Sequence, residues 1–113
     1  MRARLIRRAA LFGGLLLVAA PALPVAASPP PHTFTIVMDK MKFGPAPTGL
    51  HVGDTIIWVN HDLFRHTATA RNGAFDVDLA RNATARTVLR TAGSLPFYCR
   101  FHPGMTGTLT VAR

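Results

Sequence analysis

Short runs of β-branched and aromatic residues, separated by turn residues, constrain the fold of this chain more than any other feature. Phe34, Ile36 and Met38 alternate with Thr33, Thr35 and Val37, and residues 55–59 form a continuous run suited to a sandwich core. Three further runs cover residues 67–70, 95–99 and 106–111. Turn signals separate these runs: Gly44-Pro45-Ala46-Pro47, Gly53-Asp54, Asn72-Gly73, Ala92-Gly93-Ser94 and Pro103-Gly104. The pattern predicts an all-β sandwich or barrel.

Two segments fit this pattern less well. Residues 79–90 also suit a short helix, because Asp78 is a good N-cap and the apolar side chains fall near one face. We nevertheless predict a strand over Thr84–Arg90. Pro96 lies inside a predicted strand and has no N–H to donate, so it predicts an edge position or a bulge just before Cys99.

The first 27 residues have the pattern of a secretory signal peptide. Arginines at positions 2, 4, 7 and 8 precede an apolar run that starts at Ala9, and Val25-Ala26-Ala27 supplies the small residues that a signal peptidase needs. We expect cleavage after Ala27 and export to the periplasm. The alternative is an uncleaved membrane anchor, which is disfavoured because glycines and prolines interrupt a run shorter than the ~20 residues that a span needs.

The chain therefore divides into three predicted parts. A signal peptide covers residues 1–27, a proline-rich leader that cannot join a sheet covers residues 28–32, and one folded domain covers residues 33–113. Without the signal peptide, nine Lys and Arg face five Asp, which gives a net charge of +4. These basic residues are scattered singly, so nucleic acid is a poor partner and a protein with an acidic face is a better one.

Cys99 is the single cysteine of the chain, so the domain contains no internal disulfide. Secreted domains of this size often need a disulfide or a metal for stability. An exposed free thiol in an oxidising compartment is also prone to oxidation or intermolecular pairing. We therefore expect a bound metal to protect Cys99.

Three side chains that bind soft metals follow one another at intervals of three residues: Cys99, His102 and Met105. The loop turns through Pro103 and Gly104, and three residues of chain easily span the distance between two ligands. A thioether is a poor zinc ligand. Cysteine, histidine and methionine together favour copper.

A complete site requires a second histidine, for which we choose His66. This residue follows a polar turn and opens the run at residues 67–70, so a sheet end can hold it rigidly. The other candidates are His32 in the leader, His51 in a loop and His61 in the turn itself. We expect these three to be solvated surface residues.

With His66 added to Cys99, His102 and Met105, the chain resembles the cupredoxins, and its short ligand loop is similar to that of the amicyanin group within the plastocyanin-like proteins. Further segments occur in the family's order along nearly the whole mature chain: Met41-Lys42-Phe43-Gly44-Pro45, Val52-Gly53-Asp54-Thr55, Trp58-Val59-Asn60, His66-Thr67-Ala68-Thr69, Gly73-Ala74-Phe75-Asp76 and Met105-Thr106-Gly107-Thr108. The resemblance implies a Greek-key β-sandwich with one type 1 copper ion near one end. The implied ligands are Nδ1 of His66, Sγ of Cys99, Nδ1 of His102 and, weakly, Sδ of Met105.

The sequence departs from the family at three positions near the ligands. Arg100 and Phe101 stand where amicyanin-like loops commonly carry Thr and Pro, and Thr67 stands where some relatives have Asn. These residues surround the metal rather than bind it. They therefore bear on the reduction potential and the partner, not on the choice of metal.

The resemblance implies a one-electron carrier rather than an enzyme, with copper cycling between Cu(II) and Cu(I). A trigonal site with a long axial thioether changes little between the two states, which makes electron transfer fast. We expect the electron to leave through His102, inside an apolar docking patch of Leu63, Phe64, Pro103 and Met105.

The partner expected from the sequence is a redox protein such as a cytochrome, a dehydrogenase or an oxidase. Arg65 and Arg100 each adjoin a ligand, and we hypothesise that they form a basic rim that steers a partner with an acidic face. We expect a monomer that binds no nucleic acid and does not insert stably into a membrane.

Three other classes of function stay open at this point. A copper-handling protein would use the same ligands, with Met38 and Met41 as additional Cu(I) ligands. A thiol enzyme built on Cys99 would need oxyanion donors and a third orienting group, and the sequence identifies neither. A structural or adhesive sandwich would bind no copper.

Overall fold

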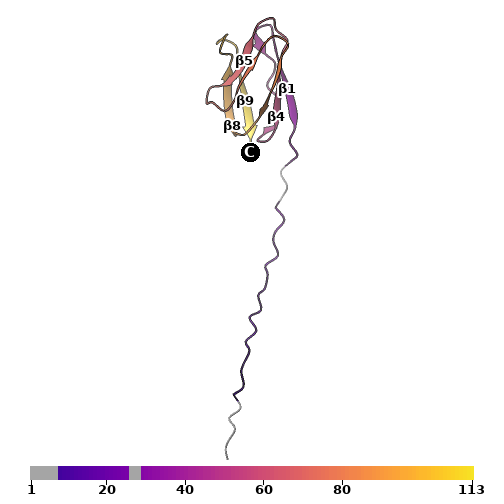
Figure 1. Ribbon diagram of the computed structural model, residues 1–113, viewed down its shortest axis with the longest axis vertical. Helices are drawn as coiled ribbons and strands as arrows, with labels where there is room; N and C mark the ends of the chain where they lie inside the picture. Colours follow the sequence, from indigo (N-terminus) through magenta and orange to yellow (C-terminus); the bar gives the residue numbers. More distant parts are fainter. Residues whose placement is uncertain (1–7, 26–28) are drawn as a thin grey trace, which may run out of the picture.

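The computed structural model describes residues 8–25 and 29–113. Its described residues contain nine strands and no helix, and Figure 1 shows the strands packed as two sheets face to face, with residues 8–25 extended and away from them. The predicted all-β Greek-key sandwich is confirmed. The chain passes repeatedly from one sheet to the other, so strands distant in the sequence become neighbours.

The two sheets differ in size. The four-stranded sheet has the order β2 (Lys42–Phe43), β1 (Thr33–Asp39), β4 (Thr55–Asn60) and β7 (Thr84–Val88). The five-stranded sheet has the order β3 (Leu50–His51), β9 (Thr106–Ala112), β8 (Gly93–Tyr98), β5 (His66–Ala70) and β6 (Asp76–Leu79). β1 pairs in parallel with β4, and β3 pairs in parallel with β9, while the remaining neighbours are antiparallel.

The longer β runs of the sequence correspond to strands of the structure. β1 begins at Thr33 as expected, and β7 confirms the strand predicted over Thr84–Arg90, although it ends at Val88. The helical alternative for residues 79–90 is wrong. No pattern in the sequence indicated β2, β3 or β6, because two to four residues are too few to establish a period.

Pro96 occupies neither an edge nor a bulge, so this prediction is wrong. Its strand, β8, lies between β9 and β5, and the register between β8 and β9 is continuous. The last pair between β5 and β8 is Ala70 with Phe97, and the carbonyl of Pro96 then accepts a hydrogen bond of 2.9 Å from the N–H of Arg71. The N–H that proline lacks therefore falls where the ladder to β5 ends, and the missing bond costs little.

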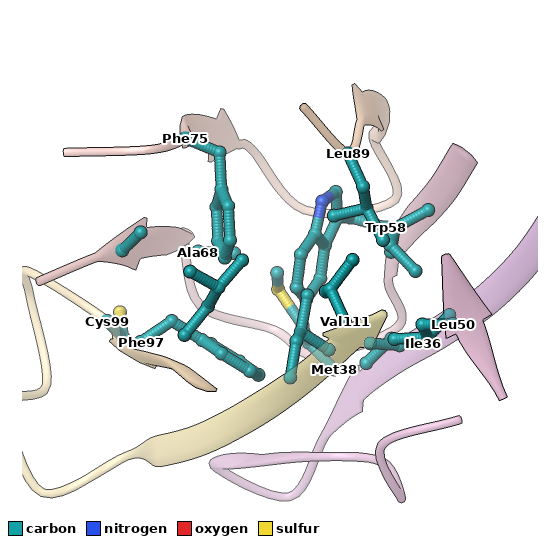
Figure 2. Packing of buried hydrophobic residues seen from close by; sticks show 14 of the residues in the cluster. Ile36, Met38, Leu50, Trp58, Ala68, Phe75, Leu89, Phe97, Cys99 and Val111 are labelled. Carbon is teal, nitrogen blue, oxygen red and sulfur yellow. The ribbon is translucent and has the colours of Figure 1, made fainter. Parts of the chain in front are cut away.

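The core lies between the two sheets and is centred on aromatic side chains. Trp58 and Phe97 are buried with ring centroids 5.3 Å apart in an edge-to-face arrangement, and Figure 2 shows them among the aliphatic side chains of both sheets. The indole N–H of Trp58 donates a hydrogen bond of 2.9 Å to Oγ1 of Thr87, so its one polar atom is satisfied. Met38 is completely buried in this core, as its alternation with polar residues predicts.

Residues 8–25 form neither a helix nor a strand, and their apolar side chains are exposed. In the part of the chain that the structure describes, no helix is long and apolar enough to cross a membrane. The predicted cleavage site after Ala27 lies outside the described residues, as do Arg2, Arg4 and Arg7. The division into signal peptide, leader and domain stays a prediction.

Candidate metal centre

Three of the four predicted ligands meet at one end of the sandwich. His66 is the first residue of β5, Cys99 directly follows β8, and His102 lies in the turn between β8 and β9. One donor atom from each lies within 4.8 Å of the other two. His66 and Cys99 are completely buried, whereas His102 is partly exposed.

The three donor atoms form a compact triangle. Sγ of Cys99 lies 3.7 Å from Nδ1 of His66 and 3.6 Å from Nδ1 of His102, and the two nitrogens are 3.2 Å apart. Metal–nitrogen and metal–sulfur bonds are about 2.0–2.3 Å long, so three ligands around one ion in a plane would lie about 3.6 Å apart. The triangle therefore has the size and the donor atoms that a trigonal copper site needs.

Met105, the fourth predicted ligand, closes the loop that carries the other two. Its N–H donates to the carbonyl of His102 at 2.8 Å, and its carbonyl accepts a hydrogen bond from the N–H of Cys99 at 3.0 Å. Its side chain is only 4% exposed. These contacts place Met105 beside the triangle, and its role as an axial ligand stays a prediction.

The sulfur of Cys99 also receives a backbone hydrogen bond. The N–H of Thr67 points at Sγ across a distance of 3.3 Å. A hydrogen bond donated to a ligand sulfur orients that sulfur and draws charge from it. Because Thr67 is the residue after His66, β5 supplies both a candidate ligand and a group that adjusts the charge on the sulfur.

Asp62, which no pattern in the sequence singled out, orients His66. Oδ2 of Asp62 lies 2.9 Å from Nε2 of His66, and the same oxygen accepts the N–H of Met41 at 2.8 Å. The hydrogen bond to His66, together with the N–H groups of Met41 and Leu63, holds the pKa of Asp62 below its ordinary value. An ionised carboxylate can only accept, so Nε2 of His66 carries a proton, and Nδ1 is the ring nitrogen that faces the triangle.

The turn that carries Asp62 is itself held by the buried side chain of Asn60. Its amide group donates to the carbonyls of Phe64, Leu79 and Ala80 at 2.8, 3.2 and 3.3 Å. Its oxygen accepts the N–H of Asp62 at 2.9 Å. The end of β4 thereby fixes the segment between Asn60 and His66, which the sequence showed only as a polar turn.

The other three histidines lie outside the triangle. His61 is exposed in the turn, and the side chain of His32 is 63% exposed. His51 is half-buried in β3, where its Nδ1 lies 3.0 Å from the carbonyl of Gly49. Among the described residues, the group formed by His66, Cys99 and His102 is the one cluster of His, Cys and acidic side chains close enough to hold an ion.

Large exposed apolar side chains lie beside the candidate ligands in the sequence, and one of them packs on His102. Leu63 is 67% exposed and Phe64 is 55% exposed, and the ring of Phe64 packs edge-on at 6.1 Å from the imidazole of His102. The expectation that Met105 joins this patch is wrong, because the chain turns inward after Gly104 and buries it. Phe101, 48% exposed, is a large apolar residue beside His102 that the sequence analysis did not assign to the patch.

The two arginines expected to form a basic rim both make ion pairs. Arg65 binds Asp78 through two hydrogen bonds of 2.7 and 3.0 Å, and Nε of Arg100 lies 3.4 Å from Asp76. The guanidinium of Arg65 holds the pKa of Asp78 below its ordinary value, and Asp78 in turn raises the pKa of Arg65. The rim therefore carries less net charge than the sequence suggests.

Comparisons with known proteins agree with this geometry. The family model described as a cupredoxin-like domain matches residues 8–111. Amicyanin of Paracoccus versutus is 27% identical over 95 residues, which cover 78% of this chain and 72% of that protein. Plastocyanin of Nostoc punctiforme is 31% identical over 90 residues, which cover 63% of this chain and 65%, slightly less than two thirds, of that protein.

Solved structures of amicyanin have the same fold. The crystal structure of the Paracoccus versutus protein superposes with a TM-score of 0.60 at 24% identity, covering 70% of this chain and 80% of that one. The Cu(I) form of an amicyanin variant superposes with a TM-score of 0.61 at 22% identity, covering 70% of this chain and 81% of that one. At these identities the likeness establishes the fold alone.

Proposed function

The chain belongs to the cupredoxin-like family, and on this premise we propose that it is a type 1 blue-copper protein that carries one electron at a time between redox partners. The observation that carries the proposal is the triangle of Nδ1 of His66, Sγ of Cys99 and Nδ1 of His102, with edges of 3.2 to 3.7 Å. Two imidazoles and one thiolate in this arrangement suit copper better than zinc, which favours four tetrahedral ligands.

Each residue of the centre has a defined role in this proposal. His66, Cys99, His102 and Met105 would hold the copper ion. Bound copper would supply a Cu(II)/Cu(I) couple. Asp62 fixes the tautomer of His66, and Thr67 donates to the sulfur of Cys99. Because these contacts hold the ligands in place, the site would rearrange little between the two copper states, which favours fast electron transfer.

The electron would enter and leave through His102, the one ligand of the triangle that is partly exposed. Leu63, Phe64 and Phe101 provide an apolar surface around it, on which a redox partner such as a cytochrome, a dehydrogenase or an oxidase would dock. Since Arg65 and Arg100 are paired with aspartates, an acidic face on the partner has less to bind than the sequence suggests. We expect apolar contact to contribute more than charge to the binding of the redox partner.

Export completes the proposal. Residues 1–27 would act as a signal peptide that directs the domain to the periplasm, and residues 33–113 would form the mature copper domain. A protein confined to an oxidising compartment needs its free cysteine protected. Complete burial of Cys99 between two imidazoles would meet that need.

A copper-handling role is the alternative that shares the same ligands. The complete burial of Met38 disfavours it as an additional Cu(I) ligand, whereas Met41 is 36% exposed. Stopped-flow exchange distinguishes the two roles, because a metal carrier would release copper readily and exchange electrons slowly. A thiol enzyme is disfavoured for a separate reason: Cys99 is completely buried and inaccessible to a substrate.

The test is the visible and EPR spectrum of the protein comprising residues 28–113 after one equivalent of Cu(II) is added. An intense blue or green chromophore that disappears on reduction and returns on oxidation would support the thiolate–copper site. A colourless protein in which Cys99 still reacts with alkylating reagents would rule out the electron-carrier proposal.

A further inference from the structure

The loop that carries the candidate ligands folds over the outer face of the five-stranded sheet. On that face, the register of β5 and β6 places Thr67 opposite Asp78 and Thr69 opposite Asp76. Successive side chains lie on opposite faces of a strand, so the side chain of Thr67 lies on the face opposite to that of His66, away from the core. It is nevertheless completely buried. Its hydroxyl lies within hydrogen-bond distance of Thr69 on the same strand and of Arg100 on the ligand loop, so the loop is attached to the sheet at this point.

Arg100 is bound to the sheet at both its backbone and its side chain. Its N–H donates to Oγ1 of Thr67 at 2.8 Å, and its Nε lies 3.4 Å from Oδ1 of Asp76. The hydroxyls of Thr67 and Thr69 are 2.9 Å apart, and Thr69 donates to the same Asp76 oxygen at 2.7 Å. These contacts form a closed circuit that begins and ends at Arg100.

Arg65 provides a second attachment beside the first. Its two hydrogen bonds to Asp78 fix the orientation of the guanidinium group. The guanidinium carbons of Arg65 and Arg100 lie 5.9 and 5.8 Å from the ring centroid of Phe101, within the range of cation–π interactions. Phe101 directly precedes His102, so its position influences that of the imidazole.

We propose that Arg65, Asp76, Asp78, Arg100 and Phe101 form a loop clamp that positions His102 and keeps Cys99 inaccessible. The role of His102 in this statement rests on the proposed function, whereas the protection of Cys99 does not. The two ion pairs to β6 fix the guanidinium groups on either side of the Phe101 contact and so restrict this part of the loop.

The clamp acts locally rather than on the stability of the whole domain. Each pair is partly exposed, with side-chain exposures of 62% and 34% for Arg65 and Asp78, so each contributes little by itself. Both ion pairs use an aspartate of β6, and both arginines contact the ring of Phe101. Loss of both pairs would free the loop without unfolding the sheets. The expected result is a change in local opening, which alkylation of a buried cysteine measures directly.

The experiment measures the rate at which iodoacetamide, an uncharged reagent, alkylates Cys99 in the metal-free full chain under native conditions. We expect Asp76→Asn combined with Asp78→Asn to raise this rate roughly fivefold or more, because both ion pairs that fix the guanidinium groups beside Phe101 are lost. Asp39→Asn is the matched control: it removes an exposed carboxylate that forms no ion pair within the described residues, and the rate should not change. Asp78→Glu alone should keep the wild-type rate.

A second measurement follows the copper site itself. In the copper-loaded protein, the double variant should shift the reduction potential or the copper hyperfine splitting in the EPR spectrum, while Asp39→Asn should leave both unchanged. Urea denaturation of each variant shows whether the domain as a whole is still stable. A double variant that alkylates at the wild-type rate and leaves the spectrum unchanged would overturn the clamp.

The two proposals fail in different ways. If no copper chromophore forms but the double variant still exposes Cys99, the proposed function fails and the clamp stands as a device that protects the thiol. If the chromophore forms but neither the alkylation rate nor the spectrum responds to the double variant, the clamp fails and the blue-copper proposal stands.

Discussion

Oδ2 of Asp62 lies 2.9 Å from Nε2 of His66, on the side of the imidazole opposite the sulfur of Cys99. The carboxylate is buried and also accepts backbone N–H groups from Met41 and Leu63. It therefore cannot rotate away without leaving these donors unpaired. The geometry of the metal centre depends on a residue that is not itself a candidate ligand.

Replacing Asp62 should weaken copper binding. In Asp62→Ala, Nε2 of His66 loses its acceptor, so the imidazole becomes free to change its tautomer or its orientation. Loss of such a partner typically reduces metal affinity by about 10–100-fold. Competition titration with a chelator of known affinity measures the change. An unchanged affinity in Asp62→Ala would show that the sheet alone orients His66.

Asp62→Asn is the matched control for this prediction. The amide oxygen can still accept the hydrogen bond from His66, while the negative charge is lost. We expect an affinity between those of the wild type and Asp62→Ala. Equal losses in the two variants would mean that the charge of Asp62, not its hydrogen bond, supports the centre.

Cys99→Ser should abolish the intense visible band without unfolding the domain. The band requires a thiolate bound to copper, and a serine hydroxyl cannot replace it. Absorption after addition of Cu(II) measures the loss, and circular dichroism confirms that the β-sheets remain. A band that survives in Cys99→Ser would mean that the colour arises elsewhere.

Met105→Leu should keep copper bound and raise the reduction potential. The thioether donates weakly to Cu(II), so its removal destabilises the oxidised state more than the reduced one. Met105 is only 4% exposed, so its volume matters for packing. Leucine is close to methionine in volume, so packing should change little. Protein-film voltammetry measures the potential. An unchanged potential would exclude Met105 as an axial ligand.

The candidate ligands could be predicted from the sequence because their spacing is local. Cys99, His102 and Met105 lie on one short loop, and the start of a strand identified His66. The contact between Asp62 and His66 depends on how Asn60 folds the intervening turn, which no periodic pattern reports. The donor atoms of the triangle were therefore more predictable than the hydrogen bonds of Asn60 and Asp62 that hold His66 in place.

Contacts that depend on strand register were not predictable. Arg65 and Arg100 looked like free cations because β6 is too short to recognise, and only the pairing of β5 with β6 brings Asp78 and Asp76 to them. The prediction that Pro96 lies at an edge or a bulge was wrong for a similar reason. Its strand is central, but its missing donor falls at the end of a ladder whose length the sequence does not show.

Asp54 should make the stability of the domain depend on pH. Its carboxylate accepts the N–H groups of His32 and His51, each at 2.8 Å, and these hydrogen bonds hold its pKa below the ordinary value. The carboxylate of Asp54 therefore binds a proton less readily in the folded protein than in the unfolded chain, where aspartates titrate at about pH 3.9. The stabilisation is complete above that pH and is lost as the pH falls through the folded pKa.

Urea denaturation between pH 7 and pH 3 tests this prediction with Asp54→Asn. The variant should be less stable at pH 7, because an amide offers one acceptor atom where the carboxylate offers two. Below about pH 5 its free energy of unfolding should fall less steeply than that of the wild type, since one titrating group is gone. Parallel pH profiles for the two proteins would contradict the role of Asp54.

Electron exchange between two copies of the protein should depend only weakly on salt. The surface around His102 is apolar, and the two nearest arginines are paired with Asp76 and Asp78. Two such surfaces repel each other little, so the self-exchange rate measured by NMR line broadening should change less than about threefold between 10 and 200 mM salt. Asp76→Asn combined with Asp78→Asn leaves two uncompensated cations on each copy, so its self-exchange rate should rise with salt more steeply than that of the wild type, as salt screens the repulsion. Arg86→Gln changes charge on β7 of the other sheet and should behave as the wild type. A steep salt dependence in the wild type would show that the rim carries substantial net charge despite its ion pairs.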